Sequence, residues 1–247
     1  MSFTLSNTVR EVAVKLPGAT RIFERLGIDY CCGGNRSLNE ACQLAQVSTE
    51  EVLSSLMELD KNHEPLPNHN WQQESLIALV DFIVQTHHVF TKQEIERLEK
   101  LLISVCKAHA QNHPELLRLN ELFKLLAEDL LPHMMKEESV LFPYVKALES
   151  AQKNHHKPPM PFFGTVKNPV RMMMMEHDNV GELLRIMRTM TNNYQVPADA
   201  CISYQTLYEA LPSFEADLHQ HIHLENNVLF PRTLELEKAA WYELQLA

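Results

Sequence analysis

The sequence predicts an all-α protein: an up-down bundle of four long helices preceded by a small helical domain. Three observations support this fold class. No segment shows a convincing strand pattern. Only 6 of the 247 residues are Gly, and the use of Leu, Ala, Glu and Met favours helices. Four long helical patterns joined by short loops follow a polar break in the chain.

The polar break divides the chain into two expected domains. It runs over residues 61–70 (KNHEPLPNHN) and contains Pro65 and Pro67, which are typical of a loop. We therefore expect a helical N-terminal domain over residues 1–62 and the four-helix bundle over residues 69–247. A domain of about 60 residues is marginally stable alone, so we expect the first domain to dock on the rest of the chain.

The N-terminal domain carries four short helical patterns, expected over residues 7–16, 19–26, 37–45 and 48–59. Two of them begin with the Ser-x-x-Glu sequence of a capping box, Ser37 with Glu40 and Ser48 with Glu51. The second pattern stops at Gly27, a residue that commonly ends helices.

The bundle carries four longer patterns, expected over residues 71–110, 114–150, 168–194 and 197–236. Pro114 suits the first turn of its helix. Pro132 and Pro212 fall inside the second and fourth helices, where we expect each to bend the axis or interrupt hydrogen bonding. A loop rich in Pro separates the second helix from the third.

Charge and hydropathy exclude several classes of partner. The net charge of −10 argues against a nucleic-acid-binding protein and against docking on anionic lipid. The most apolar stretch, residues 75–84, is short and carries Asp81, so we expect no membrane span. The N-terminus lacks a signal-peptide pattern. We therefore expect a soluble cytoplasmic protein whose five cysteines remain free thiols.

Histidine is frequent, with 13 in the chain, and a repeat organises part of this set. Residues 129–143 (DLLPHMMKEESVLFP) and 217–231 (DLHQHIHLENNVLFP) share 8 of 15 positions. Each segment contains His-x-x-x-Glu, as His133 with Glu137 and as His221 with Glu225. A spacing of four residues puts the imidazole and the carboxylate on one face of a helix, one turn apart.

Both pairs lie on apolar faces, where a bare carboxylate would be costly to bury unless it is paired or bound to a metal. The repeat also extends upstream. His87 precedes His133 by 46 residues and His177 precedes His221 by 44, and both continue apolar stripes. Each half would therefore be a helix hairpin that gives one His from its first helix and a His/Glu pair from its second.

This set of four His and two Glu fits iron, because imidazole and carboxylate ligands on bundle helices often hold paired metals. We expect Glu137 and Glu225 to bridge two non-haem irons, with two His on each iron and an oxo or hydroxo bridge from solvent. Such irons would keep room for O2 or NO. Zinc is the main competing metal and fits two carboxylates among six ligands less well. A single His-x-x-x-Glu would usually be a surface pair.

The remaining candidates near the repeat receive other roles. Adjacent helical residues point about 100° apart, so we expect His88 on the surface or behind a ligand. His219 and His223 lack a matching carboxylate, and we expect them on a solvated face. Asp129 and Asp217 lie one turn before each His of the repeat, where they would orient a ligand, line a path for iron, or simply face solvent.

Cys31 and Cys32 are adjacent and precede Gly33 and Gly34. Their Cα atoms are about 3.8 Å apart across a trans peptide, below the usual disulfide range, so a disulfide between them would be strained. Two thiols on a Gly-rich loop suit soft-metal binding, sulfur exchange or NO capture, and the alternative is a pair of inert small apolar side chains.

These motifs together resemble the iron–sulfur-cluster repair di-iron proteins, which join a Cys-Cys domain to a hemerythrin-like bundle. The resemblance covers nearly the full length. The residues that carry it are GIDYCCGG at 27–34, HMMKEE at 133–138, EHD at 176–178 and LENNVLFP at 224–231. The Pro-rich loop at 157–168 is longer than this family's pattern, and Pro132 directly precedes a ligand position.

The resemblance implies the same ligand set: His87, His133, Glu137, His177, His221 and Glu225. It also implies a cytoplasmic role in restoring clusters damaged by NO or oxidants, with Cys31 and Cys32 needed for full function. The implied partners are damaged iron–sulfur proteins and the small ligands NO or O2, and a homodimer is the oligomeric state to test. The alternatives are NO reduction at the di-iron centre, or a reversible O2 or NO sensor.

Overall fold

The computed structural model describes residues 3–62 and 70–246. The chain forms two compact units, residues 80–218 and residues 1–79 together with 219–247. The described residues are mostly helical, and their only β-type pairing is an isolated bridge between Thr8 and Ser37. The all-α prediction is therefore confirmed. No helix among the described residues is long and apolar enough to cross a membrane.

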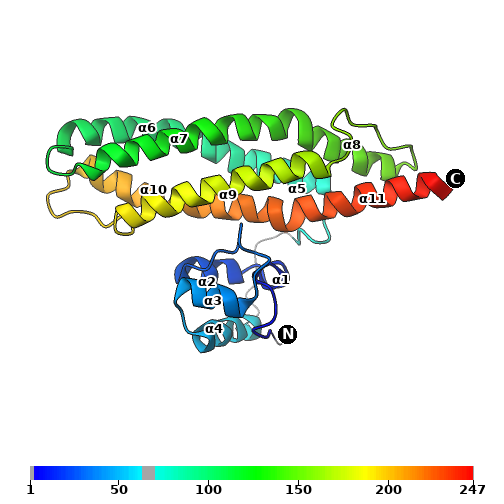
Figure 1. The fold of residues 1–247 in the computed structure, drawn as a ribbon, viewed down its shortest axis with the longest axis horizontal. Coiled ribbons are helices and arrows are strands. Elements are labelled where there is room, and N and C mark those ends of the chain that lie inside the picture. The colour runs from blue at the N-terminus through cyan, green and yellow to red at the C-terminus, as the bar shows by residue number, and fades with distance from the viewer. Residues whose placement is uncertain (1–2, 63–69, 247) are drawn as a thin grey trace. The chain divides into compact units, whose positions relative to one another are not determined.

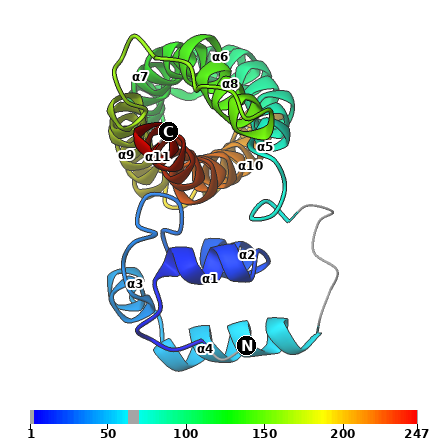
Figure 2. The ribbon, with the colours of Figure 1, turned by 90° about the vertical axis from the view of Figure 1, so that its right-hand side faces the viewer.

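Three long helices dominate the unit of residues 80–218: α6 (Val89–His109), α7 (Glu115–Lys136) and α9 (Lys167–Met190). Helix α7 packs between α6 and α9, and Figures 1 and 2 show the three running side by side. Each buries one apolar stripe, which drives their association. The buried side chains include Leu98, Leu102, Leu119, Phe123, Leu126, Val180 and Leu184.

Three π-helical turns interrupt helices that the sequence pattern predicts as continuous. Turn η1 (Ile83–His88) joins α5 (Leu76–Phe82) to α6, and η2 (Glu137–Leu141) joins α7 to α8 (Phe142–Lys153). Turn η3 (Glu225–Leu229) joins α10 (Ile202–Leu224) to α11 (Phe230–Leu246). A π turn bonds residue i to i+5, so it adds one residue and rotates every later side chain by about 100° relative to a straight α-helix.

The repeated Val-Leu-Phe-Pro sequence gives a local reason for two of these turns. Pro143 and Pro231 each follow a π turn by two residues. Proline has no backbone N–H and its ring clashes with the carbonyl four residues earlier, so the regular α-helical ladder cannot continue there. Pro132 and Pro212 lie inside α7 and α10, as expected from the sequence.

The N-terminal segment of the other unit contains α1 (Val9–Lys15), α2 (Ala19–Leu26), α3 (Leu38–Ala45) and α4 (Thr49–Asn62). The predicted capping box of Ser37 and Glu40 is present, and a second one joins Thr8 to Glu11. The four helices bury a common core. Its members include Val9, Val12, Phe23, Leu38, Val52 and Leu56.

The Cys-Cys loop begins where α2 ends. Gly27 adopts a left-handed conformation with φ 66°, which terminates the helix, and the chain then runs through residues 28–36 to α3. The start of α1 holds the far end of this loop, because the N–H of Arg10 donates to the carbonyl of Gly34 at 2.7 Å. The N–H of Val9 donates to the carbonyl of Arg36 at 2.9 Å.

Four boundaries of the bundle helices differ from the sequence-based expectation by four residues or more. The first bundle helix begins at Leu76, because residues 71–74 form turns. The third ends at Met190, because Asn192, Asn193 and Tyr194 take left-handed conformations with φ 49°, 58° and 56°. The fourth pattern begins at Ile202 and continues through η3 and α11 to Leu246. All five cysteines are free thiols.

Candidate metal centre

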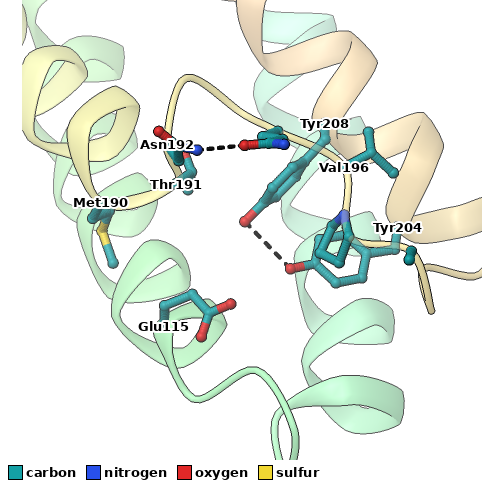
Figure 3. Close-up of a pocket in the computed structure, with 10 residues that line it drawn as sticks. Glu115, Met190, Thr191, Asn192, Val196, Tyr204 and Tyr208 are labelled. Carbon is teal, nitrogen blue, oxygen red and sulfur yellow. Dashed lines mark hydrogen bonds between the residues drawn. The ribbon is translucent and has the colours of Figure 1, made fainter.

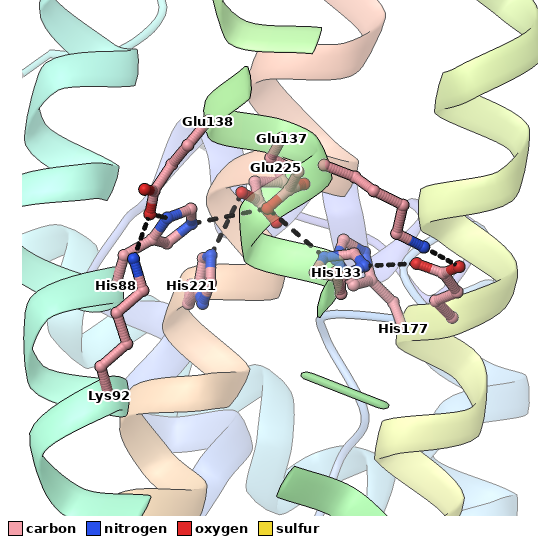
Figure 4. A network of polar contacts seen from close by, with 10 residues as sticks. His88, Lys92, His133, Glu137, Glu138, His177, His221 and Glu225 are labelled. Atoms are coloured by element: carbon pink, nitrogen blue, oxygen red, sulfur yellow. Dashed lines mark hydrogen bonds and ion pairs between the residues drawn. The ribbon is translucent and has the colours of Figure 1, made fainter. Parts of the chain in front are cut away.

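Two groups of buried His and Glu side chains could each hold a metal ion, and in each group the four ligand atoms lie within 4.8 Å of one another. One group is His88, Glu137, His221 and Glu225, and the other is His133, Glu137, His177 and Glu225. Both groups share the same two carboxylates. Figure 4 labels the side chains of both groups and marks polar contacts among them.

The distances around Glu137 are those of ligands that face a common point. The Nε2 atoms of His133 and His177 are 3.0 Å apart, and the Nε2 of His133 is 3.4 Å from Glu137 Oε2. The Nε2 of His88 is 3.5 Å from the same oxygen. Two ligand atoms about 2.1 Å from a metal and at right angles to each other would be about 3.0 Å apart. The arrangement therefore matches neighbouring positions around a metal ion.

The second repeat segment supplies a matching pair. The Nε2 of His221 is 3.1 Å from Glu225 Oε1, and both side chains are buried. Glu137 and Glu225 are fully buried, with 0% of each residue exposed. Placing two carboxylates in an apolar core is strongly unfavourable unless positive charge balances them, and divalent cations supply that charge. The donor set thus fits a metal centre.

Two of the histidines have, at Nδ1, a carboxylate that is itself paired with a lysine. Glu138 Oε1 lies 2.7 Å from His88 Nδ1 and accepts from Lys92 Nζ at 2.6 Å. Burial raises the pKa of Glu138, but the hydrogen bonds from Lys92 and His88 outweigh burial and hold that pKa below its ordinary value. The carboxylate therefore remains charged and oriented toward the imidazole.

His133 has the same arrangement. Glu176 Oε2 lies 2.7 Å from His133 Nδ1, and Lys136 donates to the other oxygen of Glu176. Burial raises the pKa of Glu176, but the hydrogen bonds from Lys136 and His133 lower it by more, so this pKa lies below its ordinary value. A carboxylate at Nδ1 places the proton there and leaves the Nε2 lone pair for a metal.

The structure differs from the sequence-based ligand set at one position. His88 belongs to the first ligand group, and His87 to neither. His87 Nδ1 instead lies 3.0 Å from Asp217 Oδ1. In a straight α-helix His87 would share a face with buried Ile83, four residues earlier. Both residues lie in η1, and the i to i+5 repeat of that π turn brings His88 to this face instead.

A sequence signal for His88 exists in the repeat itself. In the second half of the repeat, His177 precedes His221 by 44 residues. In the first half, His88 precedes His133 by 45 residues and His87 precedes it by 46, so the spacing of His88 matches the second half more closely. The structure brings together the other five predicted residues, His133, Glu137, His177, His221 and Glu225.

The two aspartates that precede the histidines of the repeat have different surroundings. Asp217 contacts His87, whereas Asp129 is exposed.

His219 and His223 do not lie on a solvated face, in contrast to the expectation. His223 is buried beside Asn227 Nδ2 at 3.1 Å, and burial lowers its pKa to about 4. His219 Nδ1 lies 3.0 Å from Glu24 Oε1.

Cys31 and Cys32 form a third candidate group with Asp29. Cys31 is buried and Cys32 is half-buried, and their sulfurs are 3.8 Å apart, so no disulfide joins them. Hydrogen bonding to Cys32 and burial raise the pKa of the Cys31 thiol well above its ordinary value. Both thiols were predicted site residues, and the loop holds them side by side.

A pocket of 620 Å³ lies elsewhere in the unit of residues 80–218, where the α9–α10 connection meets the start of α7. Figure 3 shows the hydroxyl groups of Tyr204 and Tyr208 facing each other in it, at 3.4 Å, with Glu115 opposite. None of the predicted ligands lines this pocket. It is therefore separate from the metal-ligand groups.

Comparison with known proteins gives matches along most of the chain. Residues 78–233 match the model of the hemerythrin HHE cation-binding domain, and residues 5–60 match a domain of unknown function, DUF542. A probable iron–sulfur cluster repair protein of Haemophilus influenzae is 33% identical over 95% of this chain and 99% of its own length. The chain belongs to the iron–sulfur cluster repair family.

Two further members of the family show the same extent of similarity. The iron–sulfur cluster repair protein YtfE of Musicola paradisiaca is 34% identical over 92% of this chain and 96% of its own length. The protein ScdA of Staphylococcus haemolyticus is 32% identical over 92% and 97%. The cation-binding domain spans all of the buried His and Glu ligand groups, which agrees with metal binding by these side chains.

Proposed function

We propose that this protein repairs damaged iron–sulfur clusters with a di-iron centre in its helical bundle. The observation that carries the proposal is the sharing of Glu137 and Glu225 by two four-ligand groups. Two carboxylates common to two metal positions are the usual means by which helical bundles hold paired irons. The names of the family members support the repair function.

The proposed ligand set differs from the sequence-based set only in the replacement of His87 by His88. His88 and His221 would bind one iron, and His133 and His177 the other. Glu137 and Glu225 would bridge both. The centre would supply iron for the clusters, and a solvent-derived oxo or hydroxo bridge would complete it.

The residues of this chain keep the ligands ready for metal. Glu138 and Glu176, each held by a lysine, fix the Nδ1 protons of His88 and His133 and so keep their Nε2 atoms available. The ligands and apolar side chains near them in sequence are buried from water, and low dielectric strengthens the attraction between carboxylates and cations. These side chains include Leu130, Met134, Leu141, Val180, Leu218, Val228 and Leu229.

The proposed partners are proteins whose iron–sulfur clusters have been damaged by NO or oxidants. NO and O2 are the proposed small ligands of the centre. The five free thiols agree with a reducing compartment, and we propose the cytoplasm. NO reduction or gas sensing at the same centre is the competing proposal.

The experiment has a metal arm and a repair arm. Iron-replete protein should contain about two irons per chain, and a Glu137→Gln, Glu225→Gln variant should contain nearly none. Glu121→Gln, an exposed carboxylate on α7, is the matched control. Zinc in place of iron would contradict the centre.

In the repair arm, iron-loaded protein is incubated with a [4Fe–4S] hydrase that NO has inactivated. The loaded wild type should restore activity faster than an equal amount of free iron, and the double variant should not. Recovery no better than that from free iron would refute the repair function. Nitrous oxide production from NO and a reductant would then favour the competing proposal.

A further inference from the structure

The loop that carries the cysteine pair holds three metal-binding side chains that the proposed di-iron centre does not use. Asp29, Cys31 and Cys32 each offer one ligand atom, and these atoms lie within 4.8 Å of one another. We propose that they form a separate mononuclear site for a divalent cation that accepts thiolates, such as Fe²⁺ or Zn²⁺. The site does not depend on the proposed function of the bundle.

The spacing of the ligand atoms matches one coordination geometry. With metal–sulfur distances of about 2.3 Å and a metal–oxygen distance of about 2.0 Å, tetrahedral angles place two sulfurs about 3.8 Å apart and a sulfur and an oxygen about 3.5 Å apart. In the structure the two Sγ atoms are 3.8 Å apart, and Cys31 Sγ is 3.5 Å from Asp29 Oδ1. Two of the three distances therefore match tetrahedral coordination, and the third, between Cys32 Sγ and the Asp29 carboxylate, is no longer than 4.8 Å.

Hydrogen bonds within the loop hold the carboxylate in position. Asp29 Oδ1 accepts the backbone N–H of Cys32 at 3.0 Å, and Arg36 Nη1 lies 3.7 Å from the other oxygen. Gly33 leaves space for this arrangement, because a Cβ there would lie 2.8 Å from Asp29 Oδ2 and 2.7 Å from the Arg36 guanidinium. Outer partners of this kind orient metal ligands.

Two asparagines from η3 hold the backbone of the same loop. Asn227 Nδ2 donates to the carbonyl of Tyr30 at 3.0 Å, and Asn226 Nδ2 donates to that of Cys31 at 3.3 Å. Both asparagines are buried. Gly34 permits the close approach, since a Cβ there would lie 2.8 Å from Asn227 Oδ1. The thiols are thus displayed from a backbone that is fixed before any metal arrives, which lowers the entropic cost of binding.

Exposure and charge suit a site that exchanges its metal. Cys31 is buried, Cys32 is half-buried and Asp29 is exposed, so three ligands leave the fourth position to water or an incoming ligand. Binding of one divalent ion to two thiols forms two metal–sulfur bonds and releases two protons, with no change of oxidation state. The two thiolates and the carboxylate then more than balance the charge of the cation.

Cobalt titration tests this site independently of the bundle. Co²⁺ is added to metal-free protein, and the thiolate-to-cobalt charge-transfer band is recorded. His and Glu ligands carry no sulfur, so Co²⁺ bound in the bundle cannot give this band. We expect the band to saturate at the intensity of one bis-thiolate Co²⁺ per chain.

Variants identify the ligands. Cys31→Ser and Cys32→Ser should each abolish the bis-thiolate spectrum, and Cys201→Ser, which removes an exposed thiol, should leave it unchanged. Asp29→Asn keeps an acceptor for the N–H of Cys32 and should weaken Co²⁺ binding by about tenfold or more. The proposal is overturned if wild type shows no charge-transfer band, if the band keeps its full intensity after loss of either cysteine, or if Asp29→Asn binds as tightly as wild type.

A measurement on the wild type covers the case in which a cysteine variant fails to fold. Zn²⁺ should slow the alkylation of Cys32 by iodoacetamide by about tenfold or more and leave that of Cys201 unchanged, as followed by peptide mass spectrometry. Equal effects of Zn²⁺ on both thiols, or no effect on either, would also overturn the site.

Discussion

The adjacent histidines of η1 allow a direct test of the ligand assignment, because they are neighbours in sequence with different surroundings. His88 is fully buried and its Nε2 lies 3.5 Å from Glu137 Oε2, whereas His87 Nδ1 lies 3.0 Å from Asp217. The perturbation is the same substitution at each position, His88→Gln and His87→Gln. Each variant serves as the matched control of the other.

The expected loss at His88 follows from its contacts. Its Nε2 belongs to one ligand group and its Nδ1 is 2.7 Å from Glu138 Oε1. Loss of an outer partner alone typically costs 10–100-fold in metal affinity, so loss of the ligand itself should cost about 100-fold or more, or about 2.8 kcal/mol. His87→Gln removes no ligand atom and should leave affinity within about threefold of wild type, while loss of its contact with Asp217 costs about 1 kcal/mol of stability.

Chelator competition gives the affinities. Each loaded protein is titrated with a chromogenic iron chelator, and the iron that remains bound is measured after gel filtration. Far-ultraviolet circular dichroism confirms that both variants are folded. The reasoning is refuted if His87→Gln loses iron and His88→Gln retains it, because the π turn would then not determine which imidazole binds.

Three further predictions concern other parts of the molecule. Glu138→Gln and Glu176→Gln should each weaken iron binding by about 10–100-fold in the same chelator assay. Retention of wild-type affinity would show that these carboxylates do not orient the ligand histidines. The hydrogen bond to Asp199 raises the pKa of His113, so the protonated pair stabilises the fold below about pH 6.5, and this stabilisation is lost as the pH rises through the raised pKa. Asp199→Asn should therefore lower Tm more at pH 6 than at pH 8.5. Equal shifts of Tm at the two pH values would contradict the pairing. Phe123→Ala removes a fully buried ring from α7 and should cost about 3–5 kcal/mol in urea unfolding, a loss that would be far smaller if the ring were solvated.

The sequence predicts the fold class well because helical periodicity and capping are local properties. The capping box of Ser37 and Glu40 and the helix end at Gly27 depend only on nearby residues. The repeat identifies four residues of the ligand groups because His-x-x-x-Glu positions both side chains within one turn, and its upstream extension identifies a fifth, His177. In the second repeat this spacing spans His221 in the last turn of α10 and Glu225 at the start of η3.

The remaining features depend on departures from regular periodicity or on distant contacts. His87 and His88 exchange roles because η1 adds a residue, and no proline marks that turn in advance. His223 is buried because Tyr30, far away in sequence, packs against it with ring centroids 5.4 Å apart. Sequence patterns within one helix contain no information about such a neighbour.

The π turn η1 is a place where the chain can change its length by one residue without changing its ligand. The turn holds one residue more than an α-helix over the same stretch, so deletion of a single residue between Ile83 and His87 would let the segment close as an ordinary α-helix. His88 would then follow Ile83 by four residues and would stay on the same face. Alignments of related proteins should therefore place a one-residue gap inside this turn and keep His88 aligned with the ligand histidine.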